Sequence, residues 1–299
     1  MPETFDTLAI IGLGLIGGSV AAGVREAGIA RRIVAFDQNA VSLKHAMDVG
    51  LIDNMAISAE AGAESADLIF VSVPVMAMED AFKGLRSVFG RDDVVVTDAG
   101  SVKAQVCRFA RAAHGRMPAN FVPGHPIAGS EQHGVEAADP SLFSRHRVIL
   151  TPTGQTDPAA VARVSSLWEG LGANVVEMDP AHHDSVLAQT SHLPHLLAYA
   201  LVDTLSHGGD SLEVFEYAAG GFRDFSRIAA SDPIMWRDVF QANREPVLEV
   251  LDRFRDRLDE MRDLIRDGKS AELSNIFARS KAARDHFSQL IRQREQEDE

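Results

Sequence analysis

The sequence predicts an α/β protein in which an open, doubly wound parallel sheet is followed by an all-helical region. From Thr7 to about Asp179, short apolar runs with β propensity alternate with stretches of helical periodicity. Several of these runs have almost no polar residue, which is typical of strands buried on both faces of a parallel sheet. Beyond Pro180, apolar residues recur at three- and four-residue spacing, and we find no convincing strand there.

Alternation of strand and helix gives the order of elements in the first region. The expected strands are residues 8–12, 32–36, 68–73, 94–97, 121–123, 148–151 and 175–176, and the expected helices are residues 16–26, 40–49, 76–88, 103–113 and 158–171. In the second region the expected helices are residues 187–205, 233–243, 246–266 and 271–292, separated by Gly220, Gly221 and Gly268. We therefore expect two domains, residues 1–178 and residues 179–299, which suits a chain of 299 residues.

The helix expected at residues 246–266 has one continuous apolar face. Its members are Val247, Leu248, Leu251, Phe254, Leu258, Met261 and Leu264. Long helices with such a face in a small domain often bury it against a second subunit, so we expect a homodimer formed through the C-terminal helices. The alternative is that each face packs within its own chain.

Composition argues against several classes of partner. Acidic residues outnumber basic ones 43 to 29, for a formal net charge of -14, so nucleic acid and anionic membrane surfaces are not expected partners. The longest uncharged run, residues 8–24, is too short and too rich in glycine for a membrane span, and acidic residues precede it where a signal peptide is basic. The single cysteine, Cys107, fits a reducing compartment, so we expect a cytoplasmic protein.

A glycine-rich segment follows the first expected strand and opens the first expected helix. Gly12 permits a tight turn, Gly14 lets the backbone approach a pyrophosphate, and Gly17 lets the helix pack closely on the strand. The amino terminus of that helix offers N–H groups to the phosphates. Asp37, twenty residues after Gly17, is placed to accept hydrogen bonds from the adenosine ribose and to repel a 2′-phosphate, which favours NAD over NADP.

The first region is therefore predicted to be a Rossmann-type dinucleotide-binding domain. Ser72, Val73 and Pro74 end the strand at 68–73, next to the point where the strand order should reverse. The full set of expected cofactor-binding residues is Gly12, Gly14, Leu15, Ile16, Gly17, Asp37, Ser72, Val73 and Pro74.

Three further segments combine polar side chains with neighbouring apolar runs, namely residues 98–103, 124–131 and 191–195. The first two follow expected strands, so their side chains should lie at the carboxyl ends of the sheet, where ligands bind. His125, between Gly124 and Pro126, is a candidate general base because an imidazole takes a proton near neutral pH without being permanently charged.

The chain resembles the prephenate/arogenate (cyclohexadienyl) dehydrogenases in five segments. They are Gly-Leu-Gly-Leu-Ile-Gly-Gly-Ser at 12–19, Asp-Ala-Gly-Ser-Val-Lys at 98–103, Gly-His-Pro-Ile-Ala-Gly-Ser-Glu at 124–131, Ser-His-Leu-Pro-His at 191–195 and Gly-Gly-Phe-Arg-Asp-Phe-Ser-Arg-Ile-Ala-Ala-Ser-Asp-Pro at 220–233. The resemblance covers nearly the whole chain. It implies NAD-dependent oxidation and decarboxylation of prephenate, arogenate or both, on the route to tyrosine.

The resemblance also implies residue roles. His125 matches the base that accepts the ring hydroxyl proton, and Ser101 matches the serine that orients it and the nicotinamide. Arg227 matches the arginine that holds the ring carboxylate, a task that suits a planar, permanently charged guanidinium. The matching pocket residues are Ser191, His195, Ser130, Glu131 and Trp236.

Several alternatives remain open at this stage. Arg223 is a second candidate for the role of Arg227 in binding the carboxylate, and Arg227 could instead form only a surface salt bridge with Asp224. Ser191 is also a candidate helix N-cap. Asp184 lies two helical turns before Ser191 and is a candidate specificity residue that would favour arogenate's ammonium group. His182, His183, Asp184, His192 and His195 are dense enough to consider a metal, but their spacing is not that of a compact site, and we expect none.

Two other functions fit parts of the pattern. One is another NAD-dependent dehydrogenase with a helical second domain, such as a β-hydroxyacid dehydrogenase, although Lys269 and Lys281 are the only lysines of the helical half. The other is a non-catalytic NAD-sensing module, which the fold alone does not exclude.

Overall fold

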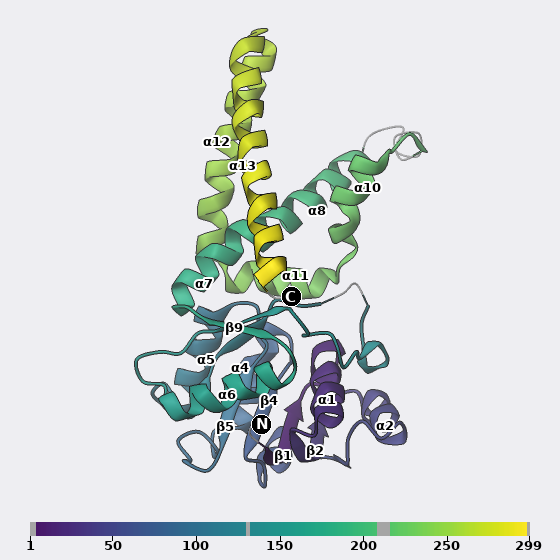
Figure 1. Ribbon diagram of the computed structural model, residues 1–299, viewed down its shortest axis with the longest axis vertical. Coiled ribbons are helices and arrows are strands. Elements are labelled where there is room, and N and C mark those ends of the chain that lie inside the picture. The colour runs from purple at the N-terminus through teal and green to yellow at the C-terminus, as the bar shows by residue number, and fades with distance from the viewer. Residues whose placement is uncertain (1–3, 130–131, 208–215, 298–299) are drawn as a thin grey trace. The chain divides into compact units, whose positions relative to one another are not determined.

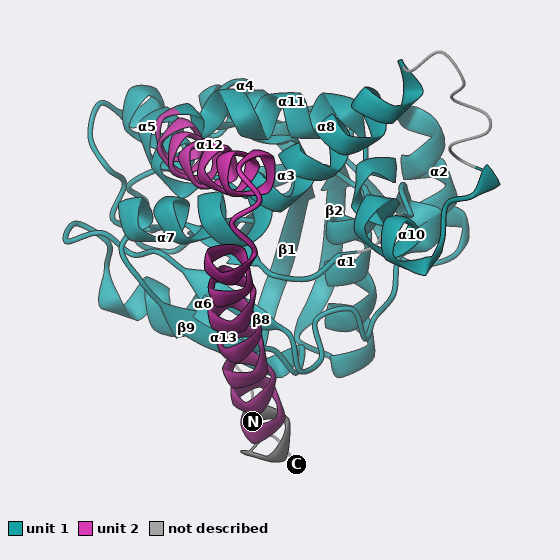
Figure 2. Cartoon of the chain, turned by 90° about the horizontal axis from the view of Figure 1, so that it is seen from above, with its two compact units in different colours: residues 1–244 teal, residues 245–299 magenta. Residues whose placement is uncertain are grey.

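The computed structural model describes residues 4–129, 132–207 and 216–297. Contacts divide the chain into two compact units, residues 1–244 and residues 245–299, which Figure 2 shows in different colours. The first unit contains the sheets and the first C-terminal helices, and the second contains most of the last two helices.

The first unit is built on a six-stranded parallel sheet, as the sequence predicts. The strands are β1 (Phe5–Ile11), β2 (Ala30–Phe36), β3 (Asn54–Met55), β4 (Leu68–Val71), β5 (Val95–Asp98) and β6 (Phe121–Val122), in the order β3-β2-β1-β4-β5-β6. The order reverses between β1 and β4, whose last residues, Ile11 and Val71, are paired, and Val71 is paired in turn with Asp98 of β5. The segments that follow these three strands therefore lie along one edge of the sheet.

Helices cover both faces of this sheet (Figure 1). Leu8 and Ile10 of β1 belong to a core cluster with α1 (Leu15–Ala27), α2 (Ala40–Asp48) and α6 (Pro158–Gly170). Ala9 and Ile11 point the other way, into a cluster with α3 (Ala59–Ala63), α4 (Met78–Gly84) and α5 (Lys103–His114). Alternate residues of one strand thus supply two cores, which explains the nearly continuous apolar runs in the sequence.

A second, three-stranded sheet was not expected. β7 (Gly124–Pro126) pairs antiparallel with β8 (Arg147–Leu150), which pairs in parallel with β9 (Asn174–Glu177). The prediction that residues 148–151 and 175–176 extend one alternating sheet is wrong, because the chain leaves the main sheet after β6. His125 consequently lies on a strand, opposite Ile149, and not in a loop.

Short elements also differ from the predictions. The sequence did not indicate β3 and α3, and the helix expected at 76–88 is a 3-10 turn, η1 (Val75–Ala77), followed by α4. A further 3-10 turn, η2 (Val135–Ala137), follows β7. These segments are too short to show a hydrophobic period.

The next helices begin earlier than predicted. α7 (Pro180–Leu187) continues through a π-helical turn, η3 (Ala188–His192), into α8 (Leu193–Ser206). Asp179 caps this long helix by accepting hydrogen bonds from the N–H groups of Ala181 and His182. Ser191 therefore lies inside a helix, and its interpretation as an N-cap is wrong. The π turn precedes Pro194, which has no N–H for the helical ladder.

Three further elements complete the first unit: α10 (Gly220–Ser226), the 3-10 turn η4 (Arg227–Ala230) and α11 (Pro233–Ala242). Trp236 and Val239 of α11 are buried in the core cluster that contains α4 and α5. This packing explains why the first unit extends to residue 244, beyond the expected domain boundary near residue 178.

The second unit consists of most of α12 (Arg244–Arg266) and all of α13 (Ser270–Glu297), close to the predicted bounds. Gly268 ends α12 in the left-handed region, with φ 65°, and Lys269 N–H donates to the carbonyl of Leu264. Among the described residues, no helix combines the length and the apolar character that crossing a bilayer requires.

Candidate active site

The glycine-rich loop connects β1 to α1 at the point where the strand order reverses. Gly12 has φ +98°, and a Cβ there would lie 2.7 Å from the carbonyl oxygen of Ser72. A Cβ on Gly17 would lie 2.1 Å from the carbonyl oxygen of Gly12. At both positions only glycine fits.

Gly14 differs from its neighbours in the loop. A Cβ at Gly14 would meet nothing within 4 Å, and as N-cap of α1 this residue supplies no side-chain hydrogen bond to the helix. The loop therefore leaves space, together with the N–H groups and positive dipole end of α1, for an anionic group. This local structure fits a dinucleotide pyrophosphate beside Leu15 and Ile16.

Asp37 follows β2 and fastens the loop. One carboxylate oxygen accepts a hydrogen bond from Leu13 N–H at 2.6 Å, and the other accepts from Asn39 N–H at 2.7 Å. The side chain is half-buried. A carboxylate oxygen can accept more than one hydrogen bond, so Asp37 can still accept a hydrogen bond from a ribose hydroxyl.

Ser72, which follows β4, also fixes the glycine loop. Its hydroxyl donates a hydrogen bond of 2.7 Å to the carbonyl of Gly12, so the segment Ser72-Val73-Pro74 is tied to the glycine loop. Val73 is half-buried and Pro74 is exposed. The residues expected to bind the cofactor thus lie along one edge of the sheet.

A buried ion pair holds the strand that carries His125. Asp98 at the end of β5 and Lys103 at the start of α5 are both fully buried, with Nζ and Oδ2 2.5 Å apart. Lys103 also donates to the carbonyl of Gly124, and Asp98 accepts from Gly124 N–H at 3.0 Å. Both polar groups of the residue before His125 are therefore clamped by one ion pair.

The His125 side chain is held by a second set of contacts. Its Nδ1 lies 2.9 Å from Nε2 of His183 on α7. His183 Nδ1 lies 2.8 Å from a carboxylate oxygen of Asp184. That carboxylate accepts hydrogen bonds from the N–H groups of Lys103 and Ala104, so it caps α5. Hydrogen bonds thus join the polar segments 98–103 and 124–131 to α7.

The structure corrects the expectation for Asp184. The residue is 2% exposed, and α5 and His183 occupy its carboxylate oxygens. It is not available to a substrate ammonium group, and its buried charge stabilises the amino end of α5 instead.

Aromatic rings of α8 and α11 pack against each other near His192 and Asn243. His195 stacks on Trp236 with ring centroids 3.7 Å apart, and its Nδ1 lies 2.9 Å from the carbonyl of Ser191. His192 contacts Asn243 at 3.0 Å. Within the described part of the chain, the buried indole N–H of Trp236 has no hydrogen-bond partner, which leaves a donor for a ligand.

The remaining expected residues are placed as follows. Ser101 follows β5 and is half-buried, and within the described ranges no hydrogen bond joins it to His125, whose ring contacts His183. Arg227 begins η4 and is exposed, whereas the Arg223 side chain, 84% exposed, lies 3.9 Å from the Asp224 carboxylate. Ser130 and Glu131 lie outside the described residues.

Burial keeps the histidine cluster uncharged. It lowers the pKa of His125 well below the usual 6.5, and the charges of His183, Lys103 and His192 act in the same direction. Burial also lowers the pKa of His183 and His195, and it lowers that of His192 to about 4. A neutral His125 is the protonation state that a general base requires.

We predict that these rings make the fold sensitive to acid. Each is neutral in the folded chain but binds a proton at about pH 6.5 when unfolded, so the free energy of unfolding should fall as pH drops below that value. Urea unfolding at about pH 7 and about pH 5.5 measures the difference. Replacing buried His192 by Gln should reduce the pH dependence, and replacing exposed His207 by Gln should not. Equal unfolding midpoints at both pH values would contradict the assignment.

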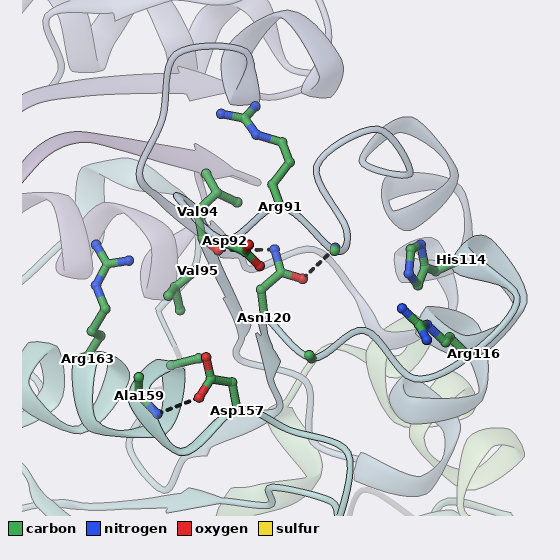
Figure 3. Close-up of a pocket in the computed structure, with 13 residues that line it drawn as sticks. Arg91, Asp92, Val94, Val95, His114, Arg116, Asn120, Asp157, Ala159 and Arg163 are labelled. Atoms are coloured by element: carbon green, nitrogen blue, oxygen red, sulfur yellow. Dashed lines mark hydrogen bonds between the residues drawn. The ribbon is translucent and has the colours of Figure 1, made fainter.

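A separate cavity of about 170 Å³ lies near the amino ends of β5 and β6 (Figure 3). Arg91, Arg116 and Arg163 line it from separate sides, and their guanidinium groups do not converge in the figure. Asp157 there caps α6 through Ala159 N–H, and Asn120 binds the loop at Gly90. This cavity is at the opposite edge of the sheet from His125, and its Asp157 and Asn120 side chains serve local structure.

Sequence reasoning missed the supporting residues Asp98, Lys103, His183 and Asn243. Two signals in the sequence point toward them: Asp98 and Lys103 are the ends of the polar segment 98–103, and His183 belongs to the dense group of histidines. Pairing between segments about 80 residues apart is not visible in local spacing.

The glycine loop at the strand switch point, with free space at Gly14, and a neutral histidine held through Gly124 by Asp98 are the features of an oxidoreductase of the Rossmann dinucleotide-binding class. Comparison with known proteins agrees and is more specific. Residues 20–177 match the family model described as prephenate dehydrogenase, nucleotide-binding domain, and residues 179–279 match prephenate dehydrogenase, dimerization domain. The chain belongs to the prephenate dehydrogenase family.

Individual relatives support the same family. The chain is 35% identical to a prephenate dehydrogenase of Bacillus subtilis, over 96% of this chain and 76% of the relative. It is 36% identical to a cyclohexadienyl dehydrogenase of Zymomonas mobilis, over 94% of this chain and 95% of the relative. A crystal structure of prephenate dehydrogenase from A. aeolicus, in complex with hydroxyphenyl propionate and NAD+, superposes with a TM-score of 0.87 at 38% identity, covering 94% of this chain and 98% of that one.

Proposed function

We propose that the chain is an NAD-dependent dehydrogenase that oxidises and decarboxylates prephenate, arogenate or both. The observation that carries the proposal is the neutral His125, fixed at the carboxyl edge of a dinucleotide-binding sheet in a member of this family. A non-catalytic NAD sensor would have no use for a base positioned by two hydrogen-bonded networks.

In the proposed reaction His125 accepts a proton and Arg227 binds the ring carboxylate of the substrate. NAD, when bound beside the glycine loop, supplies the hydride acceptor. His125 accepts the ring hydroxyl proton, so that the departing hydride leaves a dienone and not a cation. Arg227 holds the ring carboxylate until it leaves as CO2, a step driven by aromatisation, and the proton held by His125 can return to the ring oxygen.

The other site residues have binding roles in this proposal. Ser101 orients His125 and the nicotinamide, while Ser191, His195 and Trp236 border the ring pocket from η3, α8 and α11. His195 is fixed for this role by its stacking on Trp236 and its contact with the Ser191 carbonyl.

We further propose a homodimer formed through the C-terminal helices. α12 and α13 expose large apolar side chains: Leu248, Leu258, Ile265, Phe277, Phe287 and Leu290. α10 buries none of its residues, although it contains Phe222 and Phe225. Such surfaces favour burial against a second copy, in keeping with the matched dimerization domain.

Cys107, a buried free thiol, is consistent with action in the reducing cytoplasm.

The activity is tested by absorbance at 340 nm with NAD and either prephenate or arogenate. NADH formation with at least one of them is expected. No NADH with either substrate, from protein that binds NAD, would leave the sensor function as the better account. A comparison of kcat/KM between the two substrates then determines the preference.

Cofactor choice gives a prediction about Asp37. Its carboxylate lies beside the glycine loop, where it would repel a 2′-phosphate, so NADP should bind at least about tenfold more weakly than NAD. Replacing Asp37 by Ser should narrow that ratio. The Asp37→Ser variant also loses the hydrogen bond from Leu13 N–H, so it should bind both cofactors more weakly. The relevant measurement is therefore the ratio of the affinities for NAD and NADP. Equal KM values for NAD and NADP in the wild type would refute the role of Asp37.

Asp184 gives a second prediction. Because its carboxylate is buried against α5, Asp184→Asn should leave the arogenate-to-prephenate ratio of kcat/KM unchanged, while thermal stability falls with the weaker helix cap. The ratio is measured by steady-state kinetics on both substrates. A selective loss of arogenate activity would restore Asp184 as a specificity residue.

A further inference from the structure

The His125 ring has two nitrogens, and only one is left for chemistry. Nδ1 is 2.9 Å from His183 Nε2, and the two rings are 5.1 Å apart at an angle of 66°. Which of these nitrogens carries the proton decides whether His125 is a base, because a ring with hydrogen on Nε2 has no lone pair there.

The hydrogen-bond chain fixes that proton. The Asp184 carboxylate only accepts, so the hydrogen of His183 must be on Nδ1, 2.8 Å away. Neutral His183 then has a bare Nε2, which accepts from His125. His125 must donate from Nδ1, and its Nε2 is left with a free lone pair.

The surroundings of His183 keep it neutral and bury it completely. His183 is fully buried and Asp184 is 2% exposed. The negative charge of Asp184 is already matched by two N–H groups at the amino end of α5. The charged and titratable groups around His183 are Asp184, Lys103 and Asp98, and those around His125 are His183, Lys103 and His192.

We propose that His183, fixed by Asp184, is a positioning residue that holds His125 in the Nδ1–H tautomer and so leaves Nε2 as the proton acceptor. The inference deepens the proposed function and rests on it for the identity of the proton donor, the substrate hydroxyl. The tautomer itself is a property of the protein without substrate. The same contact also stabilises His125 after it takes a proton, because its Nδ1–H bond to His183 is kept.

Two substitutions at one position separate positioning from packing. In the His183→Gln variant the side-chain amide lies where Nε2 lies in the wild type, so its oxygen can still accept a hydrogen bond from His125. In the His183→Asn variant the amide lies where Nδ1 lies in the wild type, so the variant keeps the hydrogen bond to Asp184 and loses the one from His125. We expect His183→Asn to lower kcat by roughly ten- to hundredfold with NAD affinity unchanged, and His183→Gln to retain most of kcat.

Nitrogen-15 NMR of the full-length protein, without substrate, reads the tautomer directly, with the His125 signals identified by their loss in His125→Asn. The expected result is hydrogen on Nδ1 in the wild type and in His183→Gln, and a mixture of tautomers in His183→Asn. Hydrogen on Nε2 in the wild type would overturn the inference, as would equal loss of kcat in both variants. If the expected tautomer is found in a protein that oxidises neither substrate, the proposed function fails while the positioning by His183 stands.

Discussion

Replacing His125 by Asn should lower kcat by about 10²- to 10⁴-fold, the usual contribution of a general base. The amide of Asn lies where Nδ1 lies, so the variant can still donate to His183, 2.9 Å from Nδ1 in the wild type, and the network behind the site is kept. What is lost is Nε2, the nitrogen that accepts the substrate proton. Steady-state kinetics at saturating NAD and substrate measures the effect.

NAD affinity is the control for this substitution. The glycine loop and Asp37 contact each other and not His125, so the dissociation constant for NAD should be unchanged. The acidic limb of the kcat/KM profile should lie below pH 6.5 in the wild type, because burial lowers the pKa of His125. Turnover by His125→Asn within a few-fold of wild type would remove His125 from the mechanism.

Breaking the buried ion pair should have the largest effect on stability. Lys103→Met leaves the Asp98 carboxylate fully buried without its cation, and such losses cost about 3–5 kcal/mol. The same substitution releases the carbonyl of Gly124, so activity should also fall in whatever fraction remains folded. Denaturant unfolding followed by circular dichroism gives the change in free energy.

Lys83→Met is the matched control. Lys83 also pairs with carboxylates, those of Glu79 and Asp80, but on an exposed surface of α4 where water replaces the lost contacts. Its removal should leave the unfolding midpoint unchanged. The double variant Asp98→Asn with Lys103→Met removes both charges and should recover part of the loss. A Lys103→Met protein as stable as wild type would show that the pair does not clamp the strand of His125.

The main sheet could be predicted from sequence because its signals are local. Apolar runs such as the one ending at Ile11 reflect burial on two faces, and the glycine pattern reports a turn whose geometry excludes a Cβ at Gly12 and Gly17. The C-terminal helices are likewise visible as periodicity, and Gly268 does end α12.

The parts that could not be predicted depend on contacts distant in sequence. The sequence predicts a strand that ends at residue 123, before His125, because three residues of β7 show no period, and the antiparallel pairing with β8 comes from residues 147–150. Asp184 shows the same limit: its spacing from Ser191 indicates a similar helix face, whereas its carboxylate contacts α5 and His183. Helical spacing fixes the direction of a side chain only within its own helix.

The stoichiometry of the reaction tests the central claim most directly. In a single reaction with NAD and the better of prephenate and arogenate, NADH is followed at 340 nm and released CO2 is trapped and counted. Equal amounts of both, together with the aromatic product, are predicted, since hydride loss to NAD and departure of the ring carboxylate are parts of one conversion. NADH without CO2 would mark an ordinary alcohol dehydrogenase and contradict the account.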